Sequence, residues 1–389
     1  MEGPSLLVLV AALLFLVPNS SAHDTRPFAV PSQIPPPLFA GAAAWDAALG
    51  RMVLFSGEPS SGQDVSATWE YGTSGWTNVT GSTAPTPRDS AAMAYDPPGG
   101  YLLLFGGEDS RGHHLSDTWT IQNGTWTNRT TTVHPPPSIS PVMAYDAVDG
   151  YVVLYGMFPN ATGDSVPETW TFVSGAWSRL QASLLPPARY YSSLAYDPSD
   201  GYVVLFGGIS PSGVQDLSDT WVFDHGGWSE LPAPTYPPAR SGPNLAYDAT
   251  DGTLILFGGN AIGYMIELGD TWSFKAGAWT ELHPPASPPG RSSGQLAGGD
   301  TSAGVIMYGG TNATGQVYGD LWGYRAGSWS NLTAPPGAGS AAHTWTPSET
   351  LVTILWGRPL SVSLSSFCRD GRSRGDWNPA TAPRISLRA

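Results

Sequence analysis

The sequence predicts an all-β protein, a β-propeller of repeated four-stranded sheets, and three observations predict this fold class. A pair of tryptophans recurs every 50 or 51 residues, and an aromatic-glycine pair keeps the same period. No stretch within the repeats places apolar residues at helical spacing over three turns. A repeat of about 50 residues is typical of one propeller blade. The first tryptophans are Trp69, Trp119, Trp170, Trp221, Trp272 and Trp322, and the second are Trp76, Trp126, Trp177, Trp228, Trp279 and Trp329.

The copy that begins at Arg189 shows why each repeat should form four strands. The expected strands are residues 192–196, 202–206, 219–223 and 228–231. The first is small and apolar, which suits a crowded inner position, and the second is β-branched and aromatic, as in a strand buried on both faces. Turns rich in Asp, Pro and Gly separate them. Such short sheets bury their faces only by stacking around an axis, with the tryptophans between neighbours.

Several copies share a more detailed pattern. It reads Arg189, Phe206-Gly207-Gly208, Asp219-Thr220-Trp221-Val222-Phe223 and Gly227-Trp228, with similar residues around Phe105, Phe257 and Tyr308 and departures at Phe55-Ser56-Gly57 and Tyr155-Gly156-Met157. This pattern resembles the kelch repeat over roughly residues 38–357. The resemblance implies a kelch-type propeller but no single activity, because one fold hosts many functions.

The chain divides into four segments. Residues 1–22 resemble a secretory signal peptide, because an apolar run of 12 residues, too short to span a membrane, precedes small residues. Residues 23–37 are a Pro-rich N-terminal segment. The kelch-like propeller is expected over 38–357, and 358–389 form a degenerate last blade or an Arg-rich tail.

Two ring sizes fit the sequence. Six full copies end near residue 332, and a seventh begins near Ala341. Trp377 follows Trp356 by 21 residues, and the matching interval in the other copies is 21 or 22. This favours seven blades, and a six-bladed ring with a loose tail is the alternative. The tail could complete its own blade, or residues 28–31 could add an outer strand to it.

The composition indicates in which environment the protein works and which classes of partner it does not bind. The net charge of −14 argues against binding nucleic acid or anionic membranes. Cys368 is the only cysteine, so no intrachain disulfide exists and the ring must be held by packing. Six Asn-x-Ser/Thr sequons outside residues 1–22 fit a secreted, extracellular glycoprotein. The glycosylation sites expected are Asn78, Asn123, Asn128, Asn160, Asn312 and Asn331.

Four arginines are the candidate ligand-binding residues. Arg88, Arg189, Arg240 and Arg291 lead into the innermost strand of four copies, so they should surround one mouth of the central channel. Converging guanidinium groups could bind a carboxylate or an acidic peptide. Because they recur with the repeat, the favoured alternative is that each braces its own loop. Specificity is expected in the loops after the second strands, at 108–116, 157–167, 209–217, 260–269 and 311–319.

The sequence shows no convincing catalytic or metal constellation. Some copper-radical oxidases share the kelch ring but need a Cys-Tyr pair, and here the sole Cys lies in the tail. His113, His114 and His134 could share a face, but their spacing supports no metal site. Recurring carboxylate pairs such as Asp197/Asp200 are expected to form turns rather than act as acids or bind calcium. No catalytic residue, metal or cofactor is therefore predicted.

The sequence favours a secreted kelch-type recognition scaffold, which binds an extracellular protein or glycan through loops at the channel mouth. The alternative is an extracellular enzyme, an oxidase or a carbohydrate-active hydrolase, on the same ring. Histidine or carboxyl side chains of different blades meeting near the mouth would favour the enzyme. A third possibility is a surface-layer or adhesion component.

Overall fold

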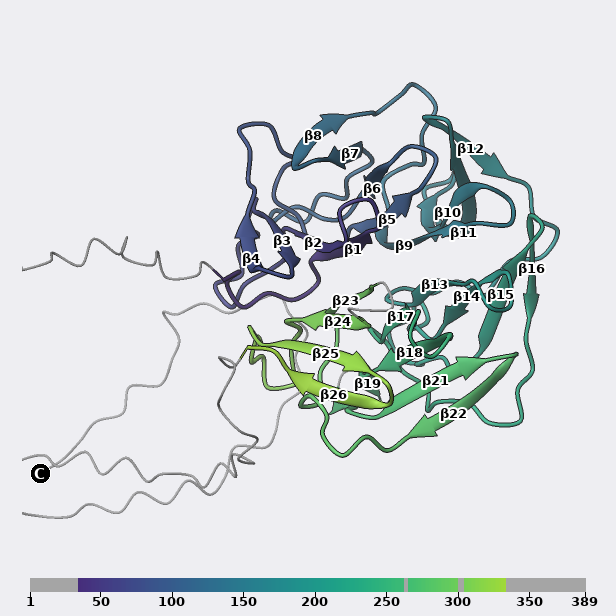
Figure 1. Ribbon diagram of the computed structural model, residues 1–389. Coiled ribbons are helices and arrows are strands. Elements are labelled where there is room, and N and C mark those ends of the chain that lie inside the picture. The colour runs from purple at the N-terminus through teal and green to yellow at the C-terminus, as the bar shows by residue number, and fades with distance from the viewer. Residues whose placement is uncertain (1–33, 262–264, 300–303, 334–389) are drawn as a thin grey trace, which may run out of the picture. The chain divides into compact units, whose positions relative to one another are not determined.

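The protein is a six-bladed β-propeller whose blades are four-stranded antiparallel sheets (Figure 1). The structure, a computed structural model, describes residues 34–261, 265–299 and 304–333. All regular structure in these residues is β-strand, as the sequence predicts, and none of them forms a helix that could cross a membrane.

Each blade is one contiguous stretch of chain. Blade 1 contains β1 (Ala42–Asp46), β2 (Arg51–Phe55), β3 (Thr68–Gly72) and β4 (Gly75–Asn78); blade 2 contains β5 (Ala92–Asp96), β6 (Tyr101–Phe105), β7 (Thr118–Gln122) and β8 (Thr125–Asn128); blade 3 contains β9 (Ile139–Asp146), β10 (Tyr151–Pro159), β11 (Ser165–Val173) and β12 (Ala176–Leu180). Blade 4 contains β13 (Ser193–Asp197), β14 (Tyr202–Phe206), β15 (Thr220–Asp224) and β16 (Gly227–Glu230); blade 5 contains β17 (Asn244–Asp248), β18 (Thr253–Phe257), β21 (Thr271–Lys275) and β22 (Ala278–Leu282); blade 6 contains β23 (Gln295–Gly298), β24 (Val305–Tyr308), β25 (Leu321–Arg325) and β26 (Ser328–Asn331). A short ribbon of β19 (Asn260–Ala261) and β20 (Ile266–Glu267) extends a loop of blade 5.

The inner strands close a ring of six. Each of β1, β5, β9, β13, β17 and β23 contacts the inner strands on both sides, and β23 contacts β1. Six is the smaller of the two ring sizes that the sequence allows, and direct contact between the first and last blades leaves no gap for a seventh. The tryptophan interval that favours seven uses Trp356 and Trp377, which lie outside the described residues, as does the closing strand expected at 28–31.

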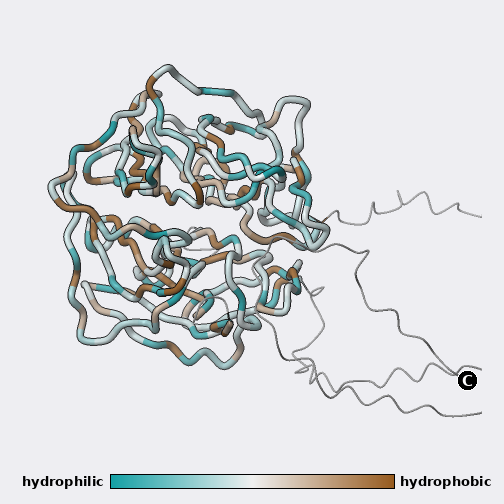
Figure 2. Tube along the Cα trace, turned by 180° about the vertical axis from the view of Figure 1, so that it is seen from behind, coloured by the Kyte–Doolittle hydropathy of each residue, from teal (hydrophilic) through white to brown (hydrophobic). Residues whose placement is uncertain are grey.

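The core is divided into six clusters, each between two neighbouring blades. Figure 2 accordingly shows hydrophobic segments spread over the whole ring rather than gathered in one place. The second strands supply residues such as Val203 to Phe206, which are completely buried because both faces of the sheet are covered. A single blade would expose these faces to water, so its stability depends on its neighbours.

The second tryptophan of each repeat joins two blades. Trp228 of blade 4 packs against Tyr155 of blade 3, with ring centroids 5.5 Å apart, and its Nε1 donates to Thr169 Oγ1 at 2.8 Å. Four other tryptophans make the same bond to the preceding blade: Trp126 to Thr68, Trp177 to Thr118, Trp279 to Thr220 and Trp329 to Thr271. The bond satisfies the indole N–H inside an apolar interface.

The junction of blades 6 and 1 differs from the other five. Leu321 takes the threonine position, so Trp76 meets no hydroxyl there and is only partly buried. Trp76 packs against Tyr308, whose hydroxyl donates to the Pro36 carbonyl at 3.0 Å. Backbone bonds also cross this junction, from Ala40 N to Ser293 O at 2.8 Å and from Gly310 N to Leu38 O at 2.8 Å.

Replacing Trp228 with Phe should therefore destabilise the ring more than replacing Trp76 with Phe. Both changes remove the same ring atoms, but only Trp228→Phe breaks a buried hydrogen bond, so the difference in unfolding free energy should be about 1 kcal/mol. Denaturant unfolding of both variants measures it. Equal losses would show that the indole–threonine bond contributes nothing.

Candidate functional site

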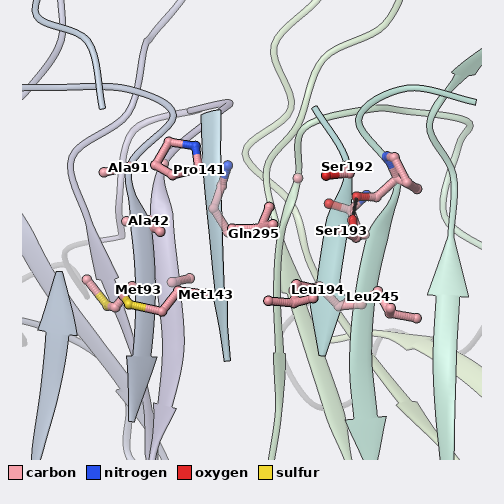
Figure 3. A pocket seen from close by; sticks show the side chains of 18 residues that line it. Ala42, Ala91, Met93, Pro141, Met143, Ser192, Ser193, Leu194, Leu245 and Gln295 are labelled. Carbon is pink, nitrogen blue, oxygen red and sulfur yellow. Dashed lines mark hydrogen bonds between the residues drawn. The ribbon is translucent and has the colours of Figure 1, made fainter. Parts of the chain in front are cut away.

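A cavity lies in the central channel of the ring, between the inner strands of the six blades. It has a volume of about 200 Å³ and is lined by three consecutive residues from each blade. Figure 3 shows Ala42, Ala91, Met93, Pro141 and Met143 on one side and Ser192, Ser193, Leu194 and Leu245 on the other, with Gln295 between them. Several lining residues, such as Ala42, Ala91 and Ser192, are small. The six inner strands can therefore approach the axis of the ring without closing the channel.

The channel wall is uncharged and its polar groups lie on one half. Ala42, Ala92 and Val142 of blades 1–3 face Ser193, Asn244 and Gln295 of blades 4–6. Ser193 donates to Pro243 O, Asn244 Nδ2 to Phe257 O at 3.2 Å, and Gln295 Nε2 to Ser293 O at 2.9 Å. No partner in the described residues bonds Gln295 Oε1, although this side chain is buried. The channel suits a small neutral group with one hydrogen-bonding side.

A ring of backbone hydrogen bonds rims one mouth of this channel. Ser90 N donates to Ala40 O, Ala40 N to Ser293 O, Ser293 N to Gly242 O and Gly242 N to Tyr191 O, at 2.7 to 3.0 Å. All five residues have positive φ, between 52° and 59°, a conformation unfavourable for the four that are not glycine. The same strained position in successive blades turns the chain so that neighbours bond directly, which rigidifies the mouth.

The four arginines of the sequence prediction lie inside their own blades. Arg189 Nε donates to Pro187 O at 2.9 Å, and Nη1 donates to Gly207 O at 3.0 Å. Both terminal nitrogens also bind the Asp219 carboxylate, at 2.6 and 2.8 Å. Arg88, Arg240 and Arg291 repeat this with Asp117, Asp270 and Asp320, and all four side chains are completely buried. This geometry supports the bracing role, and the structure does not bring the four guanidinium groups together.

Each braced aspartate also accepts a hydrogen bond from the first tryptophan of its repeat, as Asp219 does from Trp221 Nε1 at 2.7 Å. Burial opposes ionisation of Asp219, but the bonds and charge of Arg189 outweigh it and hold the pKa below the ordinary value. Blade 1 has Leu38 and Ala67 in their places, and no partner among the described residues bonds the buried Trp69 Nε1. Blade 3 has Ser138 and Glu168 there, so the arginine and the aspartate occur together in blades 2, 4, 5 and 6 only.

An acidic cluster, missed by the sequence reasoning, joins blades 1 and 2. Its members are Glu58, Asp64, Asp89, Glu108 and Asp109. Burial, followed by the charges of Asp89, Glu58, Asp109 and Glu108, raises the pKa of Asp64 to about 7. Burial also raises the pKa of Asp89 to about 6, with Glu108 and Glu58 adding to it. Raised pKa values of this kind are typical of functional sites.

These carboxylates lie on the face that carries the loops after the second strands and the loops into the first strands, here named the upper face. The bridges from Phe39 to Glu58 and from Asp89 to Glu108 connect the two loop types. On blades 4 and 5 the corresponding loops contain one carboxylate each, Asp216 and Glu267, and they also expose apolar side chains. Val214 is 80% exposed, Met265 76% and Ile266 47%. The upper face therefore has an acidic part and an apolar part, with the channel mouth between them.

Two of the predicted histidines contact the acidic cluster: His113 lies 3.1 Å from Asp109 and His114 lies 3.6 Å from Glu108. His134 bonds the Pro135 carbonyl at 2.9 Å. Within the described ranges no three His, Cys, Asp or Glu side chains are placed to hold a metal ion. The recurring aspartates form turns as expected: Asp197 Oδ1 accepts from Ser199 N at 2.9 Å.

Comparison with known proteins supports the fold alone. A solved structure described as the structure of YjhT aligns with a TM-score of 0.59 at 16% identity, covering 77% of this chain and 98% of the other. No protein-family model matches the sequence, and no match was found among curated proteins.

Replacing Arg189 with Ala should destabilise the protein by about 3 kcal/mol, because Asp219 would keep its charge in a half-buried place without its partner. The double variant Arg189→Ala/Asp219→Ala should be less destabilised than the sum of the two single variants. Denaturant unfolding of the three proteins measures this coupling. Strict additivity would contradict the bracing role.

The raised pKa of Asp64 predicts a pH-dependent stability. Its ordinary value is 3.8 and its folded value about 7, so the folded state binds a proton more tightly and stability falls as pH rises between them. Asp64→Asn should raise the melting temperature more at pH 8 than at pH 5, because only the first part of the loss has occurred by pH 5. An equal change in melting temperature at both pH values would show that the pKa of Asp64 is not raised in the folded protein.

Proposed function

We propose that this propeller is a secreted recognition scaffold that binds an extracellular protein through its upper face. The observation that carries the proposal is the division of that face: carboxylates gather on blades 1 and 2, and apolar side chains stand exposed on blades 4 and 5. Both parts lie on loops held by a rigid ring, the usual arrangement of binding surfaces.

Charge and hydrophobicity together favour a basic, partly apolar segment as the ligand. Burial and, to a smaller extent, the charges of neighbouring carboxylates raise the pKa of Asp64 and Asp89, and a cationic side chain placed against them would favour their ionised forms. Val214 and Met265 supply flexible apolar contacts of the kind that binding surfaces use. The channel of about 200 Å³ admits only a small neutral group. A glycan held at the channel alone is therefore the weaker candidate.

The acidic cluster also favours a second candidate function, that of a hydrolase. Asp64 and Asp89 belong to different blades and have raised pKa values, about 7 and about 6, which suit a proton donor and its partner. The charge of Asp89 contributes to the raised pKa of Asp64, so two carboxyl groups of different blades interact, and this is the observation that favours the alternative. A screen of glycoside substrates, compared with Asp64→Asn, separates this alternative from binding.

The proposal is tested by selecting peptides from a random library on the immobilised protein. We expect enrichment of sequences that combine Lys or Arg with apolar residues. Asp64→Asn/Asp89→Asn should abolish the preference for basic residues, and Val214→Ser/Met265→Ser the preference for apolar ones. Val173→Ser, in the β11–β12 turn on the opposite face, is the matched control and should change neither.

Binding should also weaken between pH 7.5 and pH 5, because Asp64 and Asp89 become protonated over that range, and it should weaken at high salt. Enrichment of acidic peptides, or selection unaffected by any of the upper-face variants, would refute the proposal.

A further inference from the structure

Three of the six sequons occupy one repeat position. Asn78-Val79-Thr80, Asn128-Arg129-Thr130 and Asn331-Leu332-Thr333 each begin at the last residue of an outer strand, β4, β8 and β26. These strands belong to blades 1, 2 and 6, which are neighbours in the ring. Figure 1 shows β26, β4 and β8 on one side of the ring and β12, β16 and β22 on the other.

Each of the three motifs caps its outer strand. The asparagine Oδ1 accepts from the threonine N–H two residues later, at 2.9 Å in all three. The threonine Oγ1 accepts from the first backbone N–H of the third strand, at 2.9 Å from Thr68, 2.9 Å from Thr118 and 2.7 Å from Leu321. The cap therefore uses the amide oxygen, and the three asparagines are exposed.

The cap requires a side-chain oxygen that accepts a hydrogen bond at this position. It does not require that the residue be asparagine. An aspartate forms the same turn, and this chain uses aspartate where the first strand turns into the second in blades 1, 3, 4 and 5: Asp46, Asp146, Asp197 and Asp248 each accept a backbone N–H through Oδ1. In a chain with 31 acidic residues, the outer-strand caps are asparagine in all three blades that have them. The amide nitrogen distinguishes the two residues.

We propose that Asn78, Asn128 and Asn331 are N-glycosylated, so that sugars cover one continuous arc of the rim, on blades 6, 1 and 2. An N-glycosidic bond would form between Nδ2 and the anomeric carbon of an oligosaccharide, while Nδ2 loses a proton and the isoprenoid phosphate that carried the sugar leaves. The outer strands of blades 3, 4 and 5 hold no sequon and stay bare. This inference rests on export, as the proposed function does, but not on any ligand.

Asn312 supplies a contrast within the same protein. Its Nδ2 donates to Gln316 Oε1 at 3.3 Å and to Tyr318 Oη at 3.2 Å, and its Oδ1 accepts from Thr314 and Gln316. The nitrogen that would receive a sugar is held inside its loop. Asn312 should therefore be modified much less than the three outer-strand sites.

The test is peptide mass spectrometry of the full chain purified from the organism that makes it. We expect a glycan on most copies at each of Asn78, Asn128 and Asn331, and on few copies at Asn312. Absence of a glycan at any of the three, or modification of Asn312 as often as of them, would overturn the proposal.

Isosteric variants separate the cap from the sugar. Asn128→Asp keeps the accepting oxygen and removes the amide nitrogen, so it should lose one glycan from the intact mass while the protein still folds. Thr130→Ser should keep both the cap and the glycan, and Asn312→Asp should leave the mass of the glycans unchanged. An intact mass that stays the same in Asn128→Asp, beyond the one-dalton change of the side chain, would refute the assignment. Peptide selection on unglycosylated protein tests the binding function independently.

Discussion

The contact between neighbouring blades is the constraint on which the rest of the structure depends. Each blade is too small to bury both of its faces, so every cluster of the core lies between two blades. At five of the six interfaces an indole packs on an aromatic ring and donates to a threonine of the preceding blade. The position of the channel and of the upper-face loops follows from this packing, because the ring size fixes how closely the inner strands approach.

Most of the fold was predictable because its signals are local and periodic. In blade 4 the second strand lies at 202–206 as expected, and the other three are displaced by a single residue. The number of blades was less predictable, because ring closure depends on whether β23 can reach β1, and the tryptophan intervals do not report that contact. The tail that supported a seventh blade lies outside the described residues.

The candidate site was harder to predict for a related reason. Asp64 and Asp89 are 25 residues apart in different repeats, and only the packing of blade 1 against blade 2 brings their loops together. They also lie in the loops where the repeats differ, so no periodic signal marks them. The bracing of Arg189 by Asp219 did have a signal, since arginine and aspartate are present together in four repeats. Leu38 and Ala67 replace both in the first.

The contiguity of the blades has a mechanical consequence. Among the described residues no blade combines strands from the first and last repeats, so the junction of blades 6 and 1 has no interstrand ladder across it. It holds through the apolar cluster that contains Leu54 and Ile306, a few backbone bonds and the partly buried Trp76. A pulling force on the two termini would load this junction first and then detach one sheet after another. Each detached sheet of about 50 residues would release roughly 170 Å of slack chain, so the molecule would yield in steps under tension.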